Sequence, residues 1–307
     1  MTGTIRLAKA PWLSKAPWLD RRGRFSSLKA IVFALLLLPA AILLWRTFAG
    51  TLGPRPITEV LHQLGLWAVR LIVIGLAVTP LRAVWRWPEL IFVRRQIGLA
   101  AFFYALAHFV FYIVDLGFDL SKVASEIVLR YYLAIGFVAL LLLVPLAVTS
   151  SDAMIRRLGP RWRSLHRLVY PVALLGIVHF FMQTKAGATE PLVLAGIALW
   201  LAVWRIVDGT AGARVSGALW FLVASGTLAV AATGLGEAAY YALVLRAPFD
   251  RVLGANLLWA AGWRPAWIVL ALAVALVAVA GVRRRIKSRA RGPGRQRDGG
   301  RPIRAAG

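Results

Sequence analysis

The stretch that decides the fold is residues 162–182, which read WRSLHRLVYPVALLGIVHFFM. It opens with arginines and then becomes almost wholly apolar, which is typical of a helix that enters a membrane from a basic side. His166 lies at its start and His179 lies 13 residues further on, so the two are about 20 Å apart along the helix axis. An ionisable side chain inside a membrane helix is costly and therefore indicates function.

A third histidine, His108, lies in another apolar stretch, residues 97–116. Imidazole is a common axial ligand of haem iron, and two histidines at matching depth on neighbouring helices are what a bis-histidine haem requires. The alternative is that each imidazole is satisfied by a backbone carbonyl or by a neighbouring helix. Because two histidines share one level, with no acid nearby in the membrane, the pattern favours haem ligation by His108 and His179.

Composition places the chain in the membrane class. Of its 307 residues 60% are hydrophobic, and they come as long apolar blocks. The absence of cysteine excludes disulfides, iron–sulfur clusters and covalently attached haem. The net charge is +25, and the basic residues cluster in short loops and tails. This placement is typical of residues that set membrane topology and contact anionic lipid, and it argues against nucleic acid as a partner.

Apolar blocks predict eight membrane spans and hence an all-α integral membrane fold. The predicted spans are residues 30–50, 63–84, 96–116, 127–149, 165–184, 191–207, 215–235 and 265–282.

The connections between these spans alternate in charge. The second-to-third and the fourth-to-fifth connections each carry four arginines against one acid, whereas the third-to-fourth carries three acids against one lysine. The positive-inside rule then places both termini in the cytoplasm. With this topology His108 and His179 both lie in the outer half of the membrane, and His166 lies at the inner surface.

Three charged or ionisable residues allow alternative interpretations. His166 is either the ligand of a second, inner haem or an interfacial histidine, and the facing positions, Arg94 and Arg95, are not histidines. On an ideal helix His166 and His179 also point about 140° apart, unless Pro171 kinks or over-rotates the helix. Arg70, inside an apolar run, either neutralises a haem propionate or extends towards the membrane surface. The role of His62, at an outer helix start, stays open between a structural and a quinone-contacting one.

Several blocks between about Gly50 and Asp208 follow one another in a set order. They are GPRPITEVLHQLGLWAVR at 53–70, LAVTPLR at 76–82, VRRQIGLAAFFYALAHFVFY at 93–112 and LAVTSSDAMIRRLGPRWRSLHRLVYPVALLGIVHFFM at 146–182. In sequence and spacing they resemble the haem-binding membrane subunit of the bacterial methionine sulfoxide reductase system, the MsrQ or YedZ family, within the ferric reductase-like transmembrane superfamily.

The resemblance implies a six-helix ferric reductase-like core with b-type haem, one or two per chain, and a location in the bacterial inner membrane. It implies an associated flavin mononucleotide (FMN) and electrons from the quinone pool. The acceptor would be a periplasmic molybdopterin methionine sulfoxide reductase that repairs oxidised periplasmic proteins. The family's haem-ligand candidates fall on His108, His166 and His179 of this chain.

The chain departs from the family pattern after about Asp208, where two more spans and a basic tail follow. The predicted organisation is a basic cytoplasmic segment at 1–29, the haem-binding core at 30–208, an extension with two spans at 209–282, and a cytoplasmic tail at 283–307 that is predicted to be disordered. The extension contains no histidine and therefore supplies no haem imidazole.

The sequence thus predicts a non-catalytic electron-transfer subunit, with haem held by His108, His179 and His166 and with Arg70 as a further cofactor contact. One alternative is a ferric reductase-like haem protein with another acceptor, but no G-x-G-x-x-G motif follows a strand-like segment to bind a nicotinamide cofactor. The other is a non-redox transporter or assembly protein, which predicts broken helices or an internal repeat. The sequence shows no convincing repeat.

Overall fold

The structure is a computed structural model that describes residues 16–20, 23–184, 187–258 and 262–289. Within those residues it is helical, apart from turns and one isolated bridge between Leu19 and Phe25. The described part holds eight helical segments long and apolar enough to cross a membrane, which confirms the predicted fold class. These segments are Ser27–Phe48, Pro56–Val84, Pro88–Asp115, Tyr131–Val148, Pro160–Gln183, Thr189–Thr210, Leu219–Leu245 and Pro265–Ile286.

Several boundaries differ from those predicted, and two of the differences have a clear physical reason. The fourth predicted span, residues 127–149, joins the end of α4 (Leu120–Leu129) to α5 (Tyr131–Val148). In the structure these are two helices, separated by extended backbone at Arg130 (φ −110°, ψ 99°). The seventh, α11 (Leu219–Leu245), continues ten residues past the predicted end at 235. Glu237 lowers the hydropathy there without breaking the helix, because its carboxylate is buried against polar partners.

Helix α2 (Pro56–Val84) forms the centre of the molecule. It packs most extensively against α3 (Arg94–Asp115), to which a 3-10 helix at Pro88–Val93 leads, and it also contacts α1 (Ser27–Phe48). The Tyr104 hydroxyl fastens α1 to α3, because it donates to the Leu36 carbonyl at 2.9 Å and accepts from the Ala40 amide at 3.1 Å. These two groups flank Pro39, so the hydroxyl enters the helical hydrogen-bond ladder beside a proline.

The stretch that contains His166 and His179 is not one ideal helix. It comprises α7 (Pro160–Leu165), a 3-10 segment (His166–Leu168) and α8 (Val169–Gln183). Pro171 lies in the first turn of α8, and the tighter 3-10 turn directly precedes that helix. The angle expected for a continuous α-helix therefore does not apply to His166 and His179.

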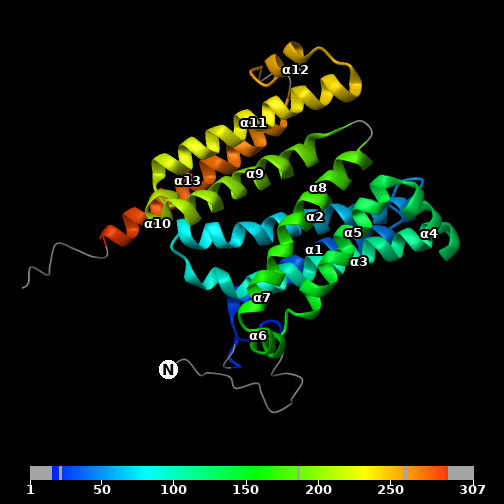
Figure 1. Cartoon of the computed structure of the whole chain (residues 1–307), viewed down its shortest axis with the longest axis horizontal. Helices are drawn as coiled ribbons and strands as arrows, with labels where there is room; N and C mark the ends of the chain where they lie inside the picture. The colour runs from blue at the N-terminus through cyan, green and yellow to red at the C-terminus, as the bar shows by residue number, and fades with distance from the viewer. Residues whose placement is uncertain (1–15, 21–22, 185–186, 259–261, 290–307) are drawn as a thin grey trace, which may run out of the picture.

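The C-terminal part of the chain lies along one flank of the bundle. Helices α9 (Thr189–Thr210), α11 and α13 (Pro265–Arg289) run side by side there (Figure 1). The short α12 (Phe249–Ala255) follows the end of α11 in the chain and precedes the start of α13. Helix α9 contacts both α2 and α11, so it joins the flank to the centre. Of the tail predicted to be disordered, residues 283–289 continue α13 and residues 290–307 lie outside the described part.

Candidate functional site

A cavity of about 600 Å³ lies between α2, α3, α5 and α8, with residues of α4 at one end. Its wall is mostly apolar and includes leucines, valines and the rings of Phe109, Phe137 and Phe180. His108 of α3 and His179 of α8 both line it. The sequence prediction that these two side chains face one another is confirmed, because their rings are in contact.

The two imidazole rings lie opposite each other with their centroids 6.3 Å apart and their planes 80° apart. Nδ1 of His108 lies 2.8 Å from the Leu61 carbonyl oxygen, and Nδ1 of His179 lies 2.8 Å from the Tyr132 carbonyl oxygen. Because a carbonyl oxygen only accepts hydrogen bonds, each Nδ1 is the protonated, donating nitrogen. Each Nε2 is therefore left with a lone pair that can bind a metal.

This geometry fits a haem iron between the rings. A metal–imidazole bond is about 2 Å long, and the ring centroid lies about 1 Å behind the bonded nitrogen. Two rings that bind one iron from opposite sides therefore have their centroids about 6 Å apart, close to the observed 6.3 Å. The cavity volume lies within the range of small-molecule and cofactor sites, and its apolar wall suits a flat macrocycle. A bare metal ion is less suited, since no group of three or more His, Asp or Glu side chains gathers among the described residues.

One end of the cavity is polar. His62 of α2, Asp115 at the end of α3, Glu126 of α4 and Arg130 between α4 and α5 line it. Arg130 donates to the Tyr132 hydroxyl at 3.1 Å and to the Glu126 carboxylate at 3.0 Å. The hydrogen bond with Tyr132, and then the Glu126 charge, raise the pKa of Arg130. The sequence prediction did not single out Arg130, because it placed this residue inside the fourth predicted span, residues 127–149.

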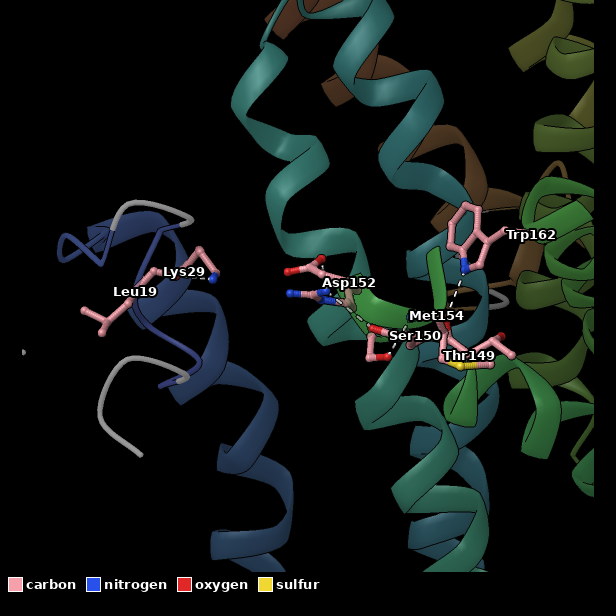
Figure 2. A network of polar contacts seen from close by, with 9 residues as sticks. Leu19, Lys29, Thr149, Ser150, Asp152, Met154 and Trp162 are labelled. Atoms are coloured by element: carbon pink, nitrogen blue, oxygen red, sulfur yellow. Dashed lines mark hydrogen bonds and ion pairs between the residues drawn. The ribbon is translucent and has the colours of Figure 1, made fainter. Parts of the chain in front are cut away.

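His166 is placed away from this cavity, near the end of the bundle that carries α6 (Asp152–Leu158). Its ring stacks on Trp162 at a centroid distance of 3.9 Å, and its Nε2 lies 3.0 Å from the Thr149 hydroxyl. Trp162 in turn donates from Nε1 to the Thr149 carbonyl at 3.0 Å (Figure 2). Both aromatic rings are thus fixed to the end of α5, and ligation of a second haem by His166 stays a prediction.

Arg70 is also outside the cavity between the histidines. Its guanidinium forms an ion pair with Glu190 of α9 at 2.5 Å and lies over the Trp67 ring at 4.9 Å. It lines a second cavity of about 570 Å³ between α1 and α2, which is almost wholly apolar. The predicted contact between Arg70 and a haem propionate therefore stays a prediction, and in this structure the guanidinium already has a carboxylate partner.

The chain is similar to known proteins over most of this bundle. The family model described as "Ferric reductase like transmembrane component" matches residues 64–177, which contain His108, His166 and His179. No solved structure matches the chain.

Three curated relatives carry the name "Protein-methionine-sulfoxide reductase heme-binding subunit MsrQ". The protein from Rhodospirillum rubrum is 45% identical over 193 residues, which are 61% of this chain and 89% of the relative. The one from Brucella anthropi is 43% identical over 178 residues, 58% of this chain and 80% of the relative. The one from Caulobacter vibrioides is 37% identical over 196 residues, 62% of this chain and 93% of the relative.

Proposed function

This chain belongs to the MsrQ family of haem-binding membrane subunits, and from that premise we propose that it is a transmembrane electron-transfer subunit with a b-type haem between His108 and His179. The electrons come from the quinone pool or a reduced flavin. They go to a periplasmic molybdopterin methionine sulfoxide reductase that repairs oxidised periplasmic proteins. The bond-changing chemistry on the sulfoxide belongs to that partner, so this chain needs no catalytic residue of its own.

The single observation that carries this proposal is the opposed pair of imidazoles. Their Nδ1 atoms are engaged by main-chain carbonyls of two further helices, and their ring centroids are separated by 6.3 Å across an apolar cavity. Purely structural histidines would be satisfied by such a hydrogen bond alone. Nothing would then require their rings to face one another across a cavity. A bound haem supplies one-electron redox chemistry at this place.

The residues of the chain have three tasks in this scheme. His108 and His179 present two nitrogen ligands at a fixed separation. The apolar walls exclude water and so limit proton and charge exchange around the site. Arg130 and His62, at the polar end of the cavity, provide positive or donor groups for carboxylates of a cofactor.

The proposal includes an orientation and two further cofactor assignments. Both termini lie in the cytoplasm of a bacterial cell and the end of the bundle with α4 faces the periplasm, in accordance with the arginine-rich connections at the opposite end. His166 is the candidate ligand of a second, inner haem. The FMN implied by the family resemblance belongs to the same proposal, and the flavin content of the purified protein tests it.

Absorption spectroscopy of the detergent-purified chain tests the proposal. The reduced-minus-oxidised spectrum of the unaltered protein should be that of b-type haem, with at least one iron per chain. His108→Ala and His179→Ala should each lose this haem, whereas His166→Ala should leave it and reveal by iron content whether a second one exists. Full retention of the spectrum by both His108→Ala and His179→Ala would exclude the assignment.

A further inference from the structure

Two glycines lie where the histidines of the cavity make their backbone contacts. A Cβ atom added to Gly65 of α2 would lie 2.7 Å from Nδ1 of His108, and one added to Gly136 of α5 would lie 2.7 Å from Nδ1 of His179. Real Cβ atoms essentially never approach so closely, and the atom they would meet belongs to the ring that makes the hydrogen bond. Any larger residue at either position would therefore displace the imidazole.

Geometry explains why the glycine is at this position in each helix. Gly65 follows Leu61 by four residues and Gly136 follows Tyr132 by four, so each glycine lies one helical turn beyond the carbonyl that accepts the hydrogen bond. A ring that approaches this carbonyl passes over the place where the side chain of the next turn would begin. Glycine in a helix interior is unfavourable by roughly 1 kcal/mol relative to alanine, so its presence at both positions requires a reason such as this close approach.

The two arrangements are copies of one another. Each histidine follows its acceptor residue by 47 positions. Leu61, Gly65 and His108 therefore recur 71 residues later as Tyr132, Gly136 and His179. Sequence comparison alone does not reveal this repeat, because the acceptor is a backbone oxygen and its side chain is free to differ.

We infer that Gly65 and Gly136 are a matched pair of positioning residues for the two haem-ligating imidazoles. Each glycine lets one ring donate from Nδ1 to the main chain, which fixes the tautomer, aims Nε2 into the cavity and sets the plane of the ring. This inference rests on the proposed function. A hydrogen bond from Nδ1 increases the basicity of Nε2, which stabilises ferric relative to ferrous iron and lowers the midpoint potential.

Redox titration of the purified full-length chain, followed by haem absorbance, tests the inference. Gly65→Ala and Gly136→Ala should each raise the midpoint potential by a similar amount, and the double variant should raise it further than either single change. Gly75→Ala of α2 and Gly98→Ala of α3 are the controls, because neither residue lines the cavity. The methyl group added at Gly75 meets only Ile97 at 3.5 Å, an ordinary contact, and the one added at Gly98 meets no atom within 4 Å, so both potentials should stay at the wild-type value.

A measurement on the unaltered protein covers the case in which an alanine variant fails to accumulate. Pulsed electron paramagnetic resonance (EPR) of the ferric protein should detect two remote imidazole nitrogens, each protonated and hydrogen-bonded, with nearly equal couplings. Unequal or unprotonated remote nitrogens would overturn the inference, and so would wild-type potentials in both glycine variants. Absence of haem from the wild-type chain would instead refute the proposed function, so the two failures are distinguishable.

Discussion

The two halves of the bundle pack in opposite ways. Around the cavity, α2, α3, α5 and α8 surround about 600 Å³ that no side chain fills. In the flank formed by α9, α11 and α13, small residues bring the helices into close contact. A Cβ on Gly226 of α11 would lie 3.2 Å from Cβ of Ala273 in α13, and Val269 is fully buried.

The difference shows which glycines serve a ligand and which serve packing. Gly65 and Gly136 make room for imidazole rings that border a space, whereas Gly196 and Gly226 make room for neighbouring helices. An unfilled cavity lowers stability, because the atoms around it lose contacts. The central helices are therefore expected to depend on a bound group for part of their stability, and the flank is expected to be stable without one.

The most extensive expected effect, which reaches whole helices, is on the local stability of the cavity walls when haem is absent. Haem-free protein, made in cells starved of haem precursors, should exchange the amide hydrogens of α3 and α8 at least about ten-fold faster than the holoprotein. Amides of α11 and α13 should exchange at unchanged rates, because they do not border the cavity. Hydrogen exchange followed by mass spectrometry measures both regions in one sample, and equal acceleration in the two would remove the proposed distinction.

A second prediction concerns an ion pair at the end of the flank that carries α12. Glu237 of α11 is 2% exposed, accepts from Asn256 at 3.0 Å and pairs with Arg264 at 3.3 Å. Glu237→Ala leaves the guanidinium without its carboxylate and should lower the free energy of unfolding by about 3 kcal/mol. Thermal unfolding in detergent measures the loss, and the haem spectrum should stay unchanged. A changed spectrum would show that flank and cavity are coupled.

The third prediction contrasts two glycine-to-alanine changes of opposite sign. Gly196→Ala in α9 would bring its new methyl group against the Thr233 side chain of α11 and should destabilise the protein by about 1–3 kcal/mol. Gly98→Ala in α3 meets no atom within 4 Å and should stabilise it by up to about 1 kcal/mol through helix propensity. Unfolding of the two variants, measured side by side, gives the change in the free energy of unfolding for each. Changes of the same sign would contradict the packing account.

The smallest expected effect is at the ion pair between α3 and α6. Arg95 and Asp152 are 2.7 Å apart, but their side chains are 44% and 48% exposed. Asp152→Asn should therefore change the free energy of unfolding by less than about 1 kcal/mol, and added salt should reduce the difference further. A loss as large as that of Glu237→Ala would mean that this end of the bundle is less accessible to water than the exposures indicate.

The sequence predicted the number of spans and the facing pair of histidines, because apolar blocks and charged connections report depth in the membrane. It did not predict that α4 and α5 are separate, since the extended backbone conformation of a single residue, Arg130, has no signature in the sequence. It could not assign Gly65, Gly136 or the carbonyls of Leu61 and Tyr132, because a backbone acceptor has no side-chain signature. The partner of Arg70 was also beyond reach, since Glu190 is 120 residues away in the chain.

The most direct test of the central claim is the EPR spectrum of the ferric, purified protein at low temperature. His108 and His179 present ring planes 80° apart, and near-perpendicular axial imidazoles leave two iron d orbitals almost equal in energy. The account therefore predicts a low-spin signal with strongly anisotropic g values, which disappears in both His108→Ala and His179→Ala. A high-spin signal in the unaltered protein, or a low-spin signal that survives both changes, would contradict it.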